Sequence, residues 1–89
     1  MSVAKQFGAN LARIRKRADQ SQEETAVRAS VHRTEISHLE RGLRVARVDT
    51  VAKLAAALEV DPGDFFDGIV WQQGDVRYGQ FKPDDPATL

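Results

Sequence analysis

The chain has 89 residues, which is enough for one small domain with a short appendage, and 42% of them are hydrophobic, which is enough for a compact core. It contains no cysteine, and this excludes disulfides and thiol chemistry and weakens any zinc site. The formal net charge is zero, yet ten basic against five acidic residues give residues 1–47 a charge of +5, and three against eight give residues 48–89 a charge of −5.

This division of charge bears on possible partners, because a phosphate backbone meets local charge rather than the total. The basic half suits a polyanion, and ordinary solvated surface charge is the alternative. No apolar run approaches the roughly 18 residues that a membrane span needs. The first residues, MSVAKQFGANL, lack the apolar stretch of a signal peptide. We therefore expect a cytoplasmic protein without a membrane segment.

Two helices are predicted before residue 30. The first is amphipathic, because apolar residues recur at helical spacing, namely Val3, Phe7, Leu11, Ile14 and Ala18. The second covers about residues 22–29 and is opened by Ser21, with Glu24 three positions later. A hydroxyl and a glutamate at this spacing are typical of a capping box, in which each side chain bonds the other residue's backbone N–H.

The third predicted helix runs over about residues 32–41 and ends before Gly42, which suits a left-handed C′ position. On a wheel of about 100° per residue, Ile36 and Leu39 point toward the core and Glu40 borders it. The outward and flanking positions hold hydrogen-bond donors, namely Arg33, Thr34, Ser37, His38 and Arg41. Such side chains can bond base edges and phosphates, which predicts a DNA-reading face, with plain solvation as the alternative.

A basic loop, residues 43–47, leads to a fourth predicted helix that is opened by Asp49 or a neighbour and carries an apolar stripe up to Leu58. Asp61 followed by a proline predicts the start of a short fifth helix over residues 62–67, which ends at Gly68. This helix is expected to bury Phe65, with Phe66 as a second candidate for burial.

Beyond residue 68 the pattern changes to β-prone residues on either side of a Gly-Asp pair, and this predicts a hairpin only weakly. The β-prone residues are Ile69, Val70 and Trp71 before the pair, and Val76 and Tyr78 after it. Residues 82–89, with two prolines and two adjacent acids, predict a disordered tail. The sequence thus divides into residues 1–68 and a C-terminal extension, residues 69–89.

The stretch SQEETAVRASVHRTEISHLERG, continued by VDTVAKLAAALEVDP, resembles the phage-repressor-like family of helix-turn-helix proteins, also called Xre-type or Cro-like. The resemblance covers about residues 5–67. It implies an all-α, lambda-repressor-like fold of five packed helices. It also implies a homodimer that binds a near-palindromic operator in double-stranded DNA, with the third helix in the major groove, as a transcriptional regulator, most naturally a repressor.

The resemblance also implies roles for individual residues. The base-contacting positions correspond to Arg33, Thr34, Ser37 and His38. The phosphate-contacting positions correspond to Gln22, which also braces the third helix, and to His32, Arg41, Arg44 and Arg47. Arg15 and Glu40 correspond to a structural ion pair between the first and third helices.

Three residues depart from the family pattern. Thr25 stands where leucine is usual, so its hydroxyl is expected to bond a helix carbonyl or to leave the core under-filled. Ser30 replaces a turn glycine, which costs about 1 kcal/mol if the residue is left-handed. His32 replaces serine at the N-cap of the third helix, where it is a poorer cap or an additional phosphate contact.

An enzyme and a protein-interaction module are the two alternatives to a DNA-binding regulator. An enzyme is not expected, because the two histidines lie six residues apart, off the spacing of a metal-ligand pair, and no glycine-rich phosphate loop is present. No cofactor or metal is expected either. A protein-interaction module, such as an antitoxin or anti-repressor partner with secondary DNA binding, is the stronger rival, because the aromatic C-terminal segment could recruit a protein.

The aromatic and apolar residues near the C-terminus also predict where two copies meet. The basic half should face DNA, so the dimer contact is expected elsewhere. The predicted contact residues are Phe65, Phe66, Ile69, Trp71 and Tyr78.

Overall fold

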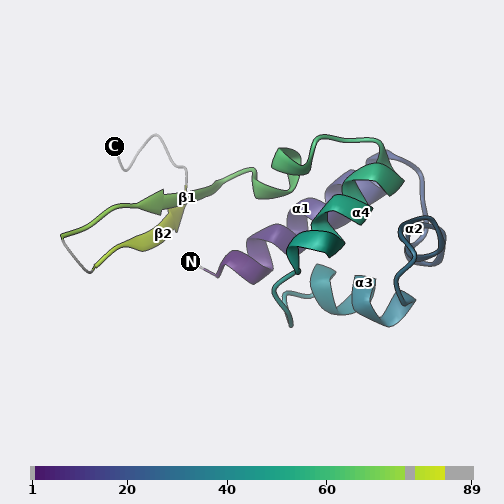
Figure 1. Cartoon of the computed structure of the whole chain (residues 1–89), viewed down its shortest axis with the longest axis horizontal. Helices are drawn as coiled ribbons and strands as arrows, with labels where there is room; N and C mark the ends of the chain where they lie inside the picture. The colour runs from purple at the N-terminus through teal and green to yellow at the C-terminus, as the bar shows by residue number, and fades with distance from the viewer. Residues whose placement is uncertain (1, 76–77, 84–89) are drawn as a thin grey trace.

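The computed structural model describes residues 2–75 and 78–83, which form a helical body and a projecting hairpin (Figure 1). Its elements are α1 (Val3–Arg17), α2 (Gln22–Ala29), α3 (Arg33–Glu40), α4 (Val48–Leu58), the 3₁₀ turn η1 (Pro62–Phe66), β1 (Ile69–Gln72) and β2 (Gln80–Pro83). Within these residues there are four α-helices, so the predicted fifth helix is a 3₁₀ turn instead. No helix of the described ranges is both long and apolar enough to cross a bilayer.

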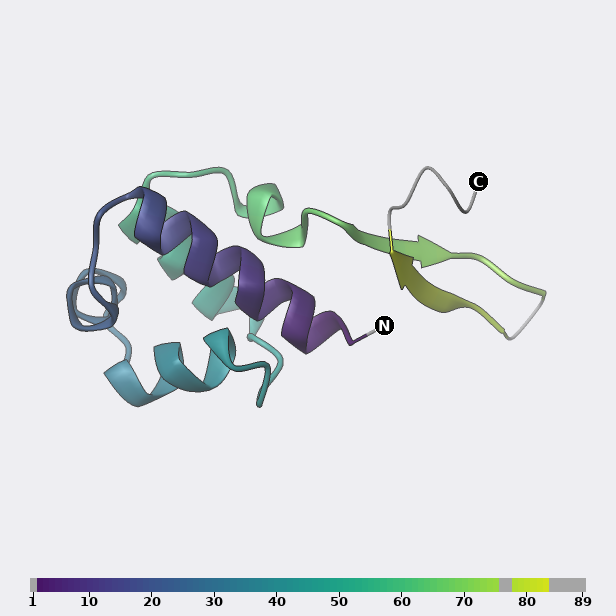
Figure 2. The same ribbon diagram turned by 180° about the vertical axis from the view of Figure 1, so that it is seen from behind.

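Within the helical body, α1 contacts α3 and η1, α2 contacts α3 and α4, and α4 also contacts η1. Figure 2 shows α1 in front of α4, with α3 below it. Apolar side chains from every helical element meet in the centre. The largest fully buried ones are Leu11, Ile36, Leu39, Leu54 and Phe65. The stripe that predicted α1 is confirmed for Phe7, Leu11 and Ile14, whereas Ala18 caps the helix and is exposed.

Local capping explains why the helices begin where they do. Ser21 Oγ accepts from the backbone of Glu24 at 3.0 Å, and Glu24 Oε1 accepts from the backbone of Ser21 at 3.3 Å, so the predicted capping box is present. Asp61 caps η1 by accepting from Gly63 N at 2.7 Å. The N-cap of α4 is Arg47, with no side-chain cap bond.

Gly8 allows α1 and α3 to touch. A Cβ at this position would lie 2.1 Å from the carbonyl oxygen of Leu39 and 2.8 Å from that of Glu40. Gly42 ends α3 with φ +71°, as predicted, and its N–H donates to Leu39 O at 3.1 Å. These two glycines fix how closely the last turn of α3 approaches the middle and start of α1.

The amide of Asn10, fully buried in α1, holds η1 against the helical body. Its Nδ2 donates to the carbonyls of Phe65 and Asp67, each at 2.8 Å. Its Oδ1 accepts from Arg13 at 2.8 Å and from Gln6 at 3.2 Å. The amide therefore uses both its donors and its acceptor, as a polar group inside a core must.

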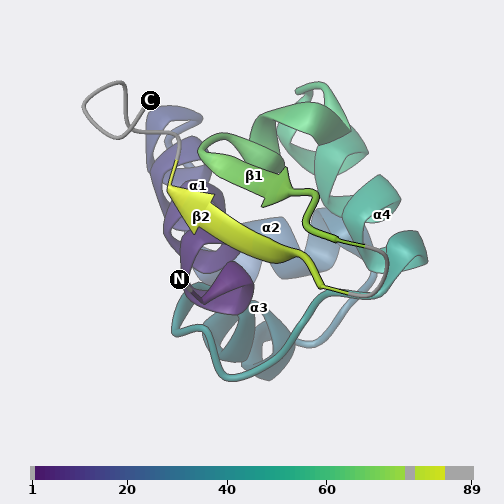
Figure 3. The same ribbon diagram turned by 90° about the vertical axis from the view of Figure 1, so that its left-hand side faces the viewer.

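The extension forms an antiparallel hairpin in which Trp71 pairs with Phe81 and Ile69 with Pro83. Figure 3, which looks at this end of the molecule, shows the hairpin in front of the helical body. The hairpin itself was predicted, but its second strand lies further along the chain than expected, because Tyr78 precedes β2. Val76 and residues 84–89 of the expected tail lie outside the described residues, whereas Lys82 and Pro83 belong to β2.

Candidate nucleic-acid interface

The surface of α3 divides as the helical wheel predicts. Ile36 and Leu39 are buried against α1, and the opposite side carries the predicted base-contacting residues. Arg33 and Thr34 are exposed in the first turn, and Ser37 and His38 are half-buried in the next. The helix thus presents four hydrogen-bonding side chains along one surface.

These four side chains are free to bond a ligand. Within the described ranges, none of them takes part in a hydrogen bond or an ion pair, although their neighbours Glu40 and Gln22 do. Solvent-facing donors without partners cost nothing in the free protein and can exchange water for base edges. The arrangement suits the major groove of B-form DNA, which is wide enough to admit a helix.

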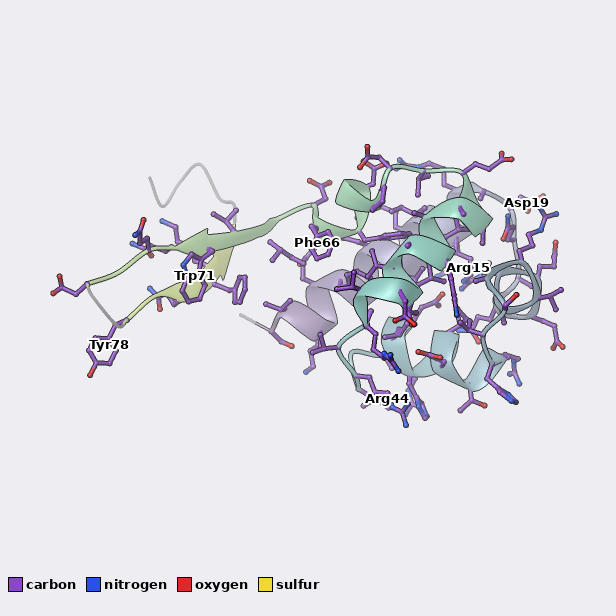
Figure 4. The ribbon with its side chains drawn as sticks, in the orientation of Figure 1. Arg15, Asp19, Arg44, Phe66, Trp71 and Tyr78 are labelled. Carbon is purple, nitrogen blue, oxygen red and sulfur yellow. The ribbon has the colours of Figure 1, made fainter. Side chains whose placement is uncertain are left out.

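Basic side chains follow α3 in the chain and border the same surface. Arg41 caps the end of α3, and Arg44 lies in the following loop; both are exposed. Figure 4 places Arg44 at the edge of the molecule beside α3. Arg47 is also exposed and lies 3.3 Å from Asp49, a contact that is weak in water. Exposed guanidinium groups next to a reading helix are placed to bond phosphate oxygens.

The carboxylate of Glu40 ties α3 to α1 and α2. Arg15 donates to it through Nε at 2.5 Å and through an η nitrogen at 3.0 Å, and both side chains are about one-tenth exposed. This hydrogen bond raises the pKa of Arg15 above its ordinary value. Gln22 donates to the same carboxylate at 3.1 Å. The ion pair implied by the family resemblance is thus present, and so is the bracing contact of Gln22.

The turn between α2 and α3 is made without glycine. Ser30 is left-handed, with φ 54° and ψ 44°, and His32 occupies the N-cap of α3 without a side-chain cap bond. Ser30 therefore has the left-handed backbone for which a steric cost was expected. His32, without a cap bond, is a poorer cap than serine. The imidazole of His32 is exposed beside the first turn of α3.

A polar link that sequence reasoning did not find joins α2 to α4. Thr25 Oγ1 donates to Gln20 Oε1 at 2.9 Å, and Gln20 Nε2 donates to Ala57 O at 3.1 Å. The expected bond from Thr25 to a helix carbonyl was wrong, because its hydroxyl donates to the side chain of Gln20 instead. The residue is fully buried. The signal available in the sequence was a threonine in a core position with a glutamine five residues earlier.

The predicted dimer residues do not all lie on the surface. Phe65 is fully buried beside Phe7, with ring centroids 5.5 Å apart, so it cannot contact a second copy and its assignment was wrong. It is buried because η1 turns its ring inward under α1. Phe66, Trp71 and Tyr78 are exposed, and Ile69 is half-buried. Figure 4 shows Trp71 and Tyr78 on the projecting hairpin.

Comparison with known families and structures agrees with this geometry. The family described as a helix-turn-helix domain matches residues 6–65, which is most of the helical body and leaves out the hairpin. Control protein C.BamHI of Bacillus amyloliquefaciens is 40% identical over 62 residues, which cover 68% of this chain and 76% of that protein.

Two solved structures show the same fold. The restriction-modification controller protein C.AhdI from Aeromonas hydrophila superposes with a TM-score of 0.72 at 30% identity, covering 74% of this chain and 100% of that one. The clp gene regulator ClgR from C. glutamicum superposes with a TM-score of 0.69 at 25% identity, covering 73% of this chain and 84% of that one.

Proposed function

Because the chain belongs to the helix-turn-helix family of DNA-binding transcription regulators, we propose that it reads double-stranded DNA in a sequence-specific manner through α3. The observation that carries this proposal is the row of unpartnered donors on the outward side of α3, bordered by exposed arginines. A role on DNA also supports a cytoplasmic location, and the proposed role is one of binding rather than catalysis.

The side chains of α3 divide between reading and positioning. Arg33 can grip a guanine through two hydrogen bonds, and Thr34 and Ser37 can bond a base or touch a thymine methyl. His38 lies one turn further along and can donate to an acceptor in the same groove. Phosphate contacts come from the helix ends and the loop, namely Gln22, His32, Arg41, Arg44 and Arg47. Gln22 can serve both roles, because only one of its donors is needed to brace Glu40.

We further propose that the protein works as a homodimer on a near-palindromic operator. One short recognition helix reads only a few base pairs, which is too little to single out a genomic site. Two copies related by a two-fold axis double the readout, with half-sites about 34–36 Å apart. A dimer seated on an operator can exclude the transcription machinery, so repression is the expected outcome.

The restriction-modification controllers suggest the kind of gene that is regulated. The whole of C.AhdI superposes on part of this chain, and 76% of control protein C.BamHI is matched. We therefore propose controller-type regulation of a restriction-modification system. An operator sequence found next to such genes would support this assignment.

Selection of bound duplexes from a random pool, using the full chain, tests the proposal. We expect a two-fold symmetric consensus whose affinity falls steeply with salt, because the arginines displace counterions from phosphates. Arg17→Ala is the control for these two measurements, the consensus and the salt dependence. It removes an exposed arginine at the end of α1 that lies outside the proposed interface. A pool that yields no consensus, and a duplex affinity that does not depend on salt, would favour the protein-interaction module instead.

A further inference from the structure

The large exposed apolar side chains of the described residues fall into two groups, apart from Val27 on α2. One group, the end patch, lies around the start of α4 and consists of Leu43, Val45, Val48 and Phe66. The other group, the hairpin patch, consists of Trp71, Tyr78 and Phe81. Two separate apolar surfaces on so small a chain indicate sites of contact with another protein.

The end patch borders a small apolar hollow. A small hollow of about 40 Å³ is lined by Val3, Phe7, Val45, Val51 and Phe66, among others. Val48, at the start of the same helix as Val51, is 88% exposed. Because a hollow of this volume has room for about one water molecule, its apolar rim favours an apolar side chain packed across it.

The hairpin patch presents a cross-strand aromatic pair on one face of the hairpin. Trp71 and Phe81 are paired across the two strands, with ring centroids 5.0 Å apart, so they stand on one face of the hairpin. Trp71 is still 56% exposed, because the other face of the pair is uncovered. A two-stranded hairpin is marginally stable by itself, so this one gains from a surface to pack against.

Both patches lie at the same end of the molecule. The hairpin leaves the helical body near Phe66 and extends away from it along the longest dimension, which is 43 Å against 25 Å and 20 Å for the others (Figures 1 and 4). The hairpin therefore reaches outward from the end patch rather than folding back over it.

We propose that two copies of this chain clasp each other, with the hairpin patch of each copy packed on the end patch of the other. The clasp rests on the proposed homodimer and specifies its interface. A two-fold axis makes the contact occur twice, because the patch pair that joins the first copy to the second also joins the second to the first. Neither patch includes a residue of α3, so the clasp leaves the proposed base-contacting side chains uncovered, while the end patch adjoins Arg44 and Arg47 in the chain.

The exposed area suits a stable dimer. A standard interface buries about 800 Å² on each partner. An aromatic side chain offers about 150–250 Å², so Phe66, Trp71, Tyr78 and Phe81, each between 40% and 77% exposed, supply roughly half of that area. Leu43, Val45 and Val48, each more than half exposed, add to it. The occupant is thus a second copy, whose surfaces supply both halves of the contact.

A mixing experiment with full-length variants tests the clasp. Val48→Asp damages only the end patch, and an aspartate in the first turn of α4 suits a helix N-terminus. Trp71→Glu damages only the hairpin patch. Sedimentation velocity without DNA should show a wild-type dimer and a dimer dissociation constant about tenfold weaker or more for each variant alone. Val27→Asp, which alters an exposed valine outside both patches, should leave the dimer intact.

The decisive sample is the equimolar mixture of Val48→Asp and Trp71→Glu. One of its two clasps joins an undamaged hairpin patch to an undamaged end patch, so the mixture should dimerise more tightly than either variant alone. A mixture that associates no better than its components overturns the clasp, as does a dimer in either variant as tight as wild type. A monomeric wild type overturns both the clasp and the homodimer, while duplex binding, measured separately, still decides the DNA-binding role. Circular dichroism confirms that each variant is folded.

Discussion

Arg15 and Glu40 join α1 to the last turn of α3 through two hydrogen bonds between one guanidinium and one carboxylate. Gln22, at the start of α2, donates to the same carboxylate. Three helices therefore meet at one side chain of α3, which lies at the border between the buried side and the outward side of that helix. The orientation of α3 relative to the helical body depends on this contact.

Replacing Glu40 with alanine should lower the free energy of unfolding by about 3 kcal/mol, because it leaves a largely buried guanidinium without its partner. Urea unfolding of the free protein measures this. Glu35→Ala is the matched control on the same helix, since Glu35 forms no side-chain ion pair among the described residues. Equal midpoints for the two variants would mean that the ion pair does not stabilise the fold.

Replacing Asn10 with alanine should destabilise the protein by about 2–4 kcal/mol, since it leaves the carbonyls of Phe65 and Asp67 without donors near the core. Thermal unfolding followed by circular dichroism measures the change. Gln6→Ala, which removes only longer bonds of 3.2 Å and 3.5 Å, should cost much less. A variant as stable as wild type would show that the amide does not hold η1 in place.

Replacing Ser30 with glycine should stabilise the protein by about 0.5–1 kcal/mol, because glycine adopts a φ of 54° without the steric cost of a Cβ. The same change at an ordinary helical position, Ala52→Gly on the exposed side of α4, should cost about 1 kcal/mol. Chemical unfolding of the Ser30→Gly and Ala52→Gly variants measures the change in the free energy of unfolding for each, and so its sign. Destabilisation at both positions would contradict a strained turn.

Replacing Arg44 with alanine should weaken binding to the preferred duplex and to random duplexes by similar factors, because a phosphate contact carries no sequence information. The slope of log affinity against log salt should become shallower by about one unit. Fluorescence anisotropy at several salt concentrations measures both. If random DNA is bound as tightly as before, the loop after α3 does not contact the backbone.

The sequence predicted those features that depend on local chemistry. Ser21 and Glu24 specify the start of α2 whatever surrounds them, and Gly42 ends α3 because few other residues tolerate its backbone angle. Ile36 and Leu39 locate the core side of α3 by spacing alone, and this in turn identified the outward row of donors. The site could thus be outlined from residues within a single helix and its flanks.

Features that depend on distant segments could not be predicted. Asn10 looks like a surface residue on α1, and only the return of the chain at η1 surrounds it with carbonyls. Phe65 and Phe66 are adjacent and alike, so both were placed among the predicted dimer contacts, although only Phe66 is exposed. The second strand is set by its register with β1, in which Phe81 pairs with Trp71, rather than by β propensity near Tyr78.

The specificity ratio of an Arg33→Ala variant tests whether α3 reads DNA in a sequence-specific manner. The ratio compares the affinity for the selected duplex with that for a duplex altered at the base pair which Arg33 faces. Loss of a two-bond contact to guanine should cost about 1–3 kcal/mol on the selected duplex and almost nothing on the altered one, so the ratio should collapse toward one. An Arg33→Ala protein that keeps the wild-type affinity and the wild-type ratio would contradict the claim.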